Sequence, residues 1–158
     1  MHPDTGRAIR LGWTVTTAEP RSVGPSAYLL VMRPPEIIDA ALPEGVLGYT
    51  DGVARIWLDH QLTAVDRRVV LDHELIHYCR GHRGHCIGVV EHGIDREVAT
   101  GLIRLDDLGE AAAWSPHPYV IAEELDVMPD TVLDRLHSLT LGERGALEAR
   151  LADAHWAA

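Results

Sequence analysis

Residues 67–86, RRVVLDHELIHYCRGHRGHC, gather most of the side chains in this chain that can do chemistry. Within them His73, Glu74 and His77 form the pattern H-E-x-x-H. Residues four apart lie one above the other on a helix, so both imidazoles can reach one metal ion, and the glutamate lies about 100° around the helix, beside that ion. Two imidazoles, a carboxylate and an open position suit zinc, and the extra glutamate can carry a proton. We predict one Zn²⁺ per chain, with His73 and His77 as ligands and Glu74 as the general base.

The pattern can also arise by chance in a chain with ten histidines, but its surroundings argue for a real helix. Thr63 is a suitable N-cap, Asp66 favours the positive end of the helix dipole, and Gly81 suits the position after the helix. Apolar residues spread around most of the helix 63–81, which predicts burial on several sides. Unpaired imidazoles would be costly in such a place, which favours a metal site.

Several residues could supply the third metal ligand. A metzincin needs a glycine and a third histidine where this chain has Arg80 and Arg83, which excludes that class. His82, His85 and Cys86 follow the helix in a glycine-containing segment and are interpreted as solvated loop residues rather than ligands.

Two carboxylates on the next predicted helix, about residues 90–105, remain. Relative to the apolar face of that helix, Glu91 lies about 20° from the centre and Glu97 about 100° away. We prefer Glu91 because a carboxylate within an apolar stripe needs a partner, and keep Glu97 as the alternative. Asp95 either hydrogen-bonds a ligand imidazole or is an ordinary surface acid. The apolar face is defined by Ile94, Val98, Leu102 and Leu105.

The composition is that of a globular protein with 46% hydrophobic residues in 158, enough for one domain or one domain with a small appendage. The net charge of -10 argues against a general nucleic-acid binder. Two cysteines are too few for a disulfide framework, and the apolar runs are too short to span a bilayer. We expect a cytoplasmic protein.

The N-terminal third predicts a small sheet. GWTVTT (12–17) and SAYLLVM (26–32) are strand-like, and residues 34–42 are interpreted as a short helix. Asp51-Gly52 between two β-rich runs predicts a hairpin over residues 46–59 with a two-residue type I′ turn. Its second arm, residues 54–59, could pair with an extended peptide, but a covered strand of the sheet is the preferred interpretation. The predicted class is α+β, with a small antiparallel sheet packed on the H-E-x-x-H helix and a second ligand helix.

The C-terminal third predicts a helical, helix-turn-helix-like subdomain. A linker at 113–118 separates a peptidase domain, 1–112, from residues 113–158, which contain three short amphipathic helices within 119–139 and 142–154. This subdomain contains eight acidic residues and three arginines, which argues against DNA binding. We expect it to pack against the peptidase domain or to dock a protein partner. The helix-turn-helix spacing is carried by Ala122, Leu125, Val127, Val132 and Leu136.

Residues 42–82, LPEGVLGYTDGVARIWLDHQLTAVDRRVVLDHELIHYCRGH, resemble the ImmA/IrrE-type metallopeptidases of phages, mobile elements and bacteria. In that family a hairpin leads into the H-E-x-x-H helix, and a following helix carries a glutamate in an E-x-x-A-(D/N)-x-x-A-like pattern. Residues 91–105, EHGIDREVATGLIRL, match with Glu91 and Asp95 in place; Ile94 replaces a small residue and Arg104 stands where proline is common. The resemblance spans about residues 42–150.

The resemblance implies a zinc endopeptidase of restricted specificity that cleaves helix-turn-helix repressors and so derepresses mobile-element or stress genes. The alternative is a regulatory protein that uses a peptidase-like fold to bind a protein partner or DNA without hydrolysis. Neither reading identifies a second donor for the oxyanion, for which Tyr78, His82 and His85 are the candidates.

Overall fold

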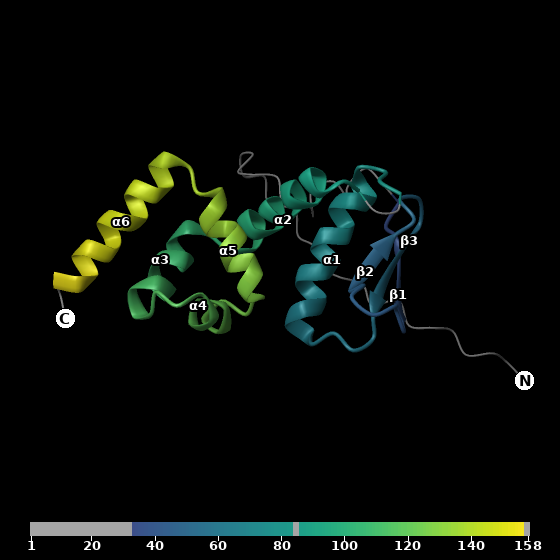
Figure 1. The fold of residues 1–158 in the computed structure, drawn as a ribbon, viewed down its shortest axis with the longest axis horizontal. Coiled ribbons are helices and arrows are strands. Elements are labelled where there is room, and N and C mark those ends of the chain that lie inside the picture. Colours follow the sequence, from purple (N-terminus) through teal and green to yellow (C-terminus); the bar gives the residue numbers. More distant parts are fainter. Residues whose placement is uncertain (1–32, 84–85, 157–158) are drawn as a thin grey trace, which may run out of the picture.

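The computed structural model describes residues 33–83 and 86–156. This part of the chain has three strands at one end and six helices that extend from the sheet along an elongated molecule (Figure 1). The predicted α+β class is confirmed. The strand-like stretches 12–17 and 26–32 lie outside the described residues. None of the described helices has both the length and the apolar content that crossing a membrane requires.

The three strands form a mixed sheet in the order β1-β3-β2. The strands are β1 (Glu36–Ala40), β2 (Gly48–Thr50) and β3 (Arg55–Asp59). β3 pairs antiparallel with β2 and parallel with β1. The prediction of an all-antiparallel sheet is therefore wrong. The predicted helix over residues 34–42 is also wrong, because these residues follow prolines that favour extended backbone and then pair with β3 along its whole length.

The central place of β3 confirms the preferred interpretation of residues 54–59 as a covered strand and argues against their pairing with a peptide. β3 has a neighbour on each side, so its backbone groups are already paired. Within the described residues, β2 is an edge strand instead.

The predicted hairpin between β2 and β3 is confirmed, but its two-residue turn is wrong. The strands are joined by the loop Asp51–Ala54, in which Gly52 has a positive φ of 65°. Oδ1 of Asp51 accepts hydrogen bonds from the backbone N–H groups of Val53, Ala54 and Arg55. This carboxylate organises a wider loop than the type I′ turn, which requires a positive φ at Asp51 as well.

α1 (Ala64–Cys79) is the predicted H-E-x-x-H helix. Oγ1 of Thr63 accepts from the N–H of Asp66 at 3.2 Å, and Gly81 takes a φ of +66°, as expected of the residues at the two ends. The helix is buried on two sides, as predicted. Val70 and Tyr78 pack with the apolar residues of β3, whereas Val69 and Ile76 pack with α2.

α2 (Gly88–Leu102) is shorter than the predicted helix 90–105 at its C-terminal end. Ile103 leaves the helix in extended conformation because its side chain, only 1% exposed, inserts into the core of the helices that follow. Leu105 begins α3 (Leu105–Trp114), which the sequence did not predict. The three predicted C-terminal helices are confirmed: α4 (Pro118–Glu124), α5 (Pro129–Ser138) and α6 (Leu141–Trp156).

The C-terminal helices share one apolar core. The residues of the predicted helix-turn-helix spacing all pack in it, together with Ile103, Leu108 and Leu147. This core extends across the boundary predicted at residue 112, and the division into two domains stays a prediction. Arg135 of α5 is 3% exposed; its Nε donates to the carbonyl of Ile103 at 2.9 Å and its Nη2 to Oε1 of Glu143 at 2.6 Å. The guanidinium therefore fastens α5 to α6 and to the end of α2.

The Arg135–Glu143 pair gives a first prediction. The N–H of Thr140 and the guanidinium of Arg135 lower the pKa of Glu143 from 4.5 to about 2. A lowered pKa in the folded state contributes stability that is full above pH 4.5 and is lost as the pH falls towards 2. At pH 7, Glu143→Gln should lower the free energy of unfolding by roughly 2 kcal/mol, measured in urea.

The loss should shrink as the pH falls from 4.5 towards 2, because the unfolded chain then binds a proton that the folded carboxylate does not. Glu148→Gln, an exposed acid on the same helix, is the matched control and should change the free energy of unfolding little. Equal effects of the two substitutions would contradict this role of Glu143.

Candidate metal centre

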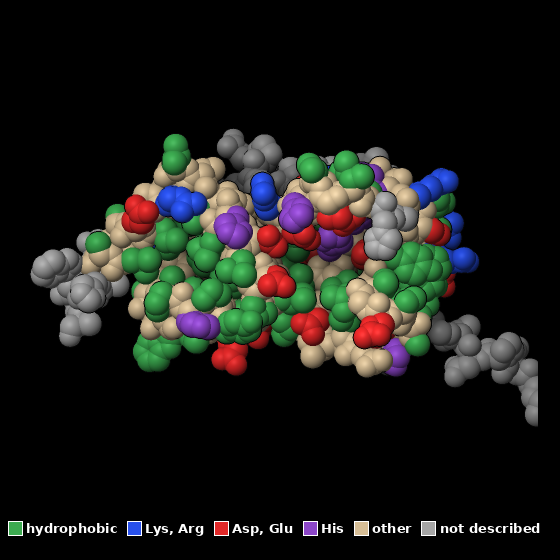
Figure 2. Space-filling model, in the orientation of Figure 1, with side chains coloured by type: hydrophobic (Ala, Val, Ile, Leu, Met, Phe, Trp, Pro, Cys, Tyr) green, Lys and Arg blue, Asp and Glu red, His purple; other side chains and the backbone are tan. Residues whose placement is uncertain are grey.

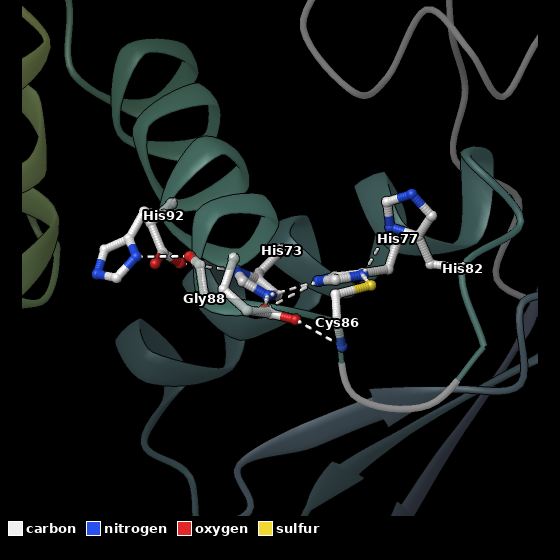
Figure 3. Close-up of polar contacts among 8 residues, drawn as sticks. His73, His77, His82, Cys86, Gly88 and His92 are labelled. Atoms are coloured by element: carbon white, nitrogen blue, oxygen red, sulfur yellow. Dashed lines mark hydrogen bonds and ion pairs between the residues drawn. The ribbon is translucent and has the colours of Figure 1, made fainter.

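α1 places its two histidines one turn apart with their rings converging. Nε2 of His73 lies 3.0 Å from Nε2 of His77 (Figure 3). The side chain of His77 is 6% exposed and that of His73 is 20% exposed. The i, i+4 spacing predicted this convergence, and burial of the helix on two sides leaves the rings little freedom to turn away.

Glu91 reaches the same point from α2. Its Oε2 lies 3.2 Å from Nε2 of His73 and 3.2 Å from Nε2 of His77. The helices are held at this separation by the contact of Ile94 and Val98 with α1. The preferred carboxylate is thus the one that the fold brings to the imidazoles. The alternative, Glu97, instead forms an ion pair with Arg80.

The three atoms form a triangle of the size that a tetrahedral zinc ion requires. Zn–N and Zn–O distances of about 2.0–2.2 Å at tetrahedral angles separate neighbouring ligand atoms by roughly 3.3–3.4 Å. The observed sides are 3.0, 3.2 and 3.2 Å. His73, His77 and Glu91 therefore form a group that can hold a metal ion.

Neighbouring groups orient each of the three side chains. Oδ1 of Asp95 lies 2.9 Å from Nδ1 of His73, which confirms the contact proposed for Asp95. The N–H of Cys86 donates to Oε1 of Glu91 at 3.1 Å and leaves Oε2 to face the imidazoles. Such contacts fix the tautomer and the direction of a metal ligand.

The charge states of two ligands suit a cation. Burial, followed by the neighbouring His73, lowers the pKa of His77 and so favours the neutral ring that metal binding needs. Burial raises the pKa of Glu91, but His77 and His73 outweigh it, so that the net pKa is lowered and the carboxylate stays ionised.

Glu74 stands beside this group without joining it. Its side chain is buried, and burial, followed by the charge of Glu91, raises its pKa to about 7. A Cβ on Gly48 of β2 would lie 3.1 Å from Cγ of Glu74 and 2.7 Å from Val70, so the strand backbone lies directly against this part of α1. Glu74 can therefore exchange protons near neutral pH.

A pocket of about 620 Å³ opens over these residues between β2, α1, α2 and α5. Among the described residues, its charged lining residues are acids and histidines, and none is a lysine or arginine. Burial, then Asp95 and Asp130, raises the pKa of Asp134 on its α5 wall. Acidic and histidine side chains accordingly gather at the middle of the face shown in Figure 2. The acidic and histidine lining residues are His73, Glu74, His77, Glu91, Asp95, Asp130 and Asp134.

Sequence reasoning missed two parts of this centre. His82 and Cys86 are half-buried. Nδ1 of His82 lies 3.1 Å from Nδ1 of His77, and Sγ of Cys86 lies 3.8 Å from the same atom. Their interpretation as solvated loop residues is therefore wrong. Their spacing of five and nine residues from His77 was the available signal. No local pattern pointed to the α5 wall. Tyr78, a candidate oxyanion donor, donates its hydroxyl to the carbonyl of Arg33 instead, and His85 lies outside the described residues.

No family model, curated protein or solved structure matches this chain. The resemblance to the ImmA/IrrE-type metallopeptidases stays a prediction.

The geometry predicts that Glu91 contributes more to metal binding than Glu97. Glu91→Ala should weaken metal binding at least about 100-fold, because it removes a ligand atom, whereas Glu97→Ala removes only a contact to Arg80. Zinc affinity of the two variants, measured by competition with a chelator, tests the ranking. The reverse order would transfer the ligand role to Glu97.

Asp95 should matter through His73. Asp95→Ala leaves the three ligand atoms in place but frees the ring of His73, and should weaken zinc binding about 10- to 100-fold. The same competition assay applies. An affinity equal to that of the wild type would reduce Asp95 to a surface acid.

Proposed function

We propose that this chain is a zinc-dependent endopeptidase of restricted specificity. The observation that carries the proposal is the convergence of His73, His77 and Glu91 beside the buried carboxyl group of Glu74, in one pocket. Ligands for an ion, together with a separate group that exchanges protons near pH 7, are what hydrolysis of a peptide bond requires. A site for metal storage would have no use for Glu74.

Each residue has a distinct part in the proposed reaction. Zinc, when bound, would polarise the scissile carbonyl group and make a water molecule more acidic. Glu74 accepts a proton from the attacking water and returns it to the leaving amine. Asp95 keeps His73 in the tautomer whose Nε2 faces the ion, and the N–H of Cys86 keeps Oε2 of Glu91 turned inwards.

The edge strand β2 supports an extended substrate. β2 lines the pocket, and an extended peptide can add to such an edge through backbone hydrogen bonds. Because Gly48 lets β2 lie against Glu74, a peptide bond paired with β2 would pass close to the proton-transfer group. Tyr49 of β2, which lines the pocket, stacks on Trp57 of β3 with ring centroids 4.6 Å apart, so its side chain is held in place beside the proposed substrate.

The charge of the pocket supports a basic substrate segment. Its wall carries Asp95, Asp130 and Asp134, and no lysine or arginine lines it in the part of the chain that the structure describes. A segment with lysine or arginine near the cleaved bond would offset these charges. Helix-turn-helix repressors, the substrates implied by the family resemblance, bind DNA phosphates and so carry such segments.

Glu74→Gln separates hydrolysis from metal binding. The variant should retain one zinc per chain and lose cleavage by at least about 100-fold, because proton transfer of this kind contributes 10²- to 10⁴-fold. Wild type and variant are incubated with the helix-turn-helix repressor encoded beside the gene, and products are identified by mass spectrometry.

Glu97→Gln, on the outer side of α2, is the matched control and should cleave like the wild type. Cleavage that survives in Glu74→Gln would show that the base is wrongly assigned. Zinc binding with tight capture of the repressor but no cleavage by the wild type would favour the non-hydrolytic alternative.

A further inference from the structure

A second set of donor atoms lies on the other side of His77. His77, His82 and Cys86 each offer one ligand atom, and these atoms all lie within 4.8 Å of one another. Figure 3 shows His82 and Cys86 at the ring of His77, away from the side on which it faces His73. Neither His82 nor Cys86 lines the pocket.

We propose that these three atoms form a second metal site, which takes a borderline or soft divalent ion such as Zn²⁺. A tetrahedral zinc ion with two nitrogen ligands and one sulfur ligand separates the nitrogens by roughly 3.3 Å and each nitrogen from sulfur by roughly 3.6 Å. The observed distances from Nδ1 of His77 are 3.1 Å to Nδ1 of His82 and 3.8 Å to Sγ of Cys86. A thiolate among the donors selects against Mg²⁺ and Ca²⁺.

The backbone around this set is held independently of an ion. The N–H of His82 donates to the carbonyl of His77 at 3.0 Å, just after the positive φ of Gly81. The hairpin covers the same place, since a Cβ on Gly52 would lie 2.3 Å from the carbonyl oxygen of His82. At the other end, the N–H of Cys86 is bound to Glu91. Both new donors are thus positioned by contacts to α1, the hairpin and α2.

The two sites share one imidazole. His77 offers Nε2 to the first group and Nδ1 to the second, so an ion in the second site displaces the remaining ring proton and the thiol proton to solvent. Two cations on one ring repel each other, so whichever ion binds later binds more weakly. The ion of the second site would hold Cys86, whose N–H positions Glu91, and would not contact a substrate in the pocket, because neither His82 nor Cys86 lines it.

Cobalt(II) is the probe, because it takes the zinc donors and gives a strong near-ultraviolet charge-transfer band when a thiolate binds it. The full-length, metal-free, reduced protein should bind two equivalents, the second at least about tenfold more weakly. The thiolate band should accompany one of the two equivalents and be absent from the other. Cys86→Ser and His82→Ala should each bind one equivalent without the band.

Cys79→Ser is the matched control, because this half-buried thiol packs with the core between α1 and β3 and should leave the band unchanged. Circular dichroism checks that each variant is folded. His73→Ala removes a donor of the first group only, and should lose the first-site equivalent and keep the thiolate band.

Three outcomes would overturn the second site. They are a single equivalent without a band, a single equivalent that carries the band, and two equivalents in Cys86→Ser. All readouts are independent of cleavage, so the proposed peptidase can fail while the second site stands. Absence of any cobalt binding would reject both metal sites.

Discussion

The contact between α1 and α2 is the constraint on which the rest of the centre depends. Val69 and Ile76 on one helix and Ile94 and Val98 on the other are buried together, and full burial of each such side chain contributes about 1.5–3 kcal/mol. This apolar contact brings Glu91 to the two imidazoles of α1. The candidate ligands lie at the edge of this contact, so a change in the distance between α1 and α2 would alter the separation of Glu91 from the imidazoles as well as the stability of the fold.

Local patterns were sufficient for the elements whose determinants are close in sequence. Thr63, Gly81 and the apolar spread between them define α1, and the prolines in the first turns of α4 and α5 fit the predicted helices. Pairing between distant segments was not predictable. Strand β1 owes its conformation to β3, some twenty residues later, and Ile103 ends α2 because of a core formed by later helices. Both errors are cases where tertiary contacts override local preference.

The candidate site shows the same division. The positions of His73, Glu74 and His77 follow from helix periodicity, and that of Glu91 follows from its place on an apolar face. The positions of His82 and Cys86 depend on the direction that the chain takes after Gly81, which the hairpin constrains through Gly52. Their spacing from His77 places them near the end of the helix, but it does not give the direction of the chain after Gly81. The same holds for the pocket wall on α5, which exists only because that helix docks on α2.

That wall has a consequence for how the chain can be divided. Met128, Asp130, Thr131 and Asp134 belong to the C-terminal helices, yet they enclose the pocket over the histidines. α2 is shared, with Glu91 in its first turn and Ile103, just beyond its last residue, in the C-terminal core. A fragment ending at residue 112 would keep every candidate ligand but would lose the α5 wall of the pocket. The candidate metal ligands and one wall of the pocket above them thus lie in different thirds of the polypeptide.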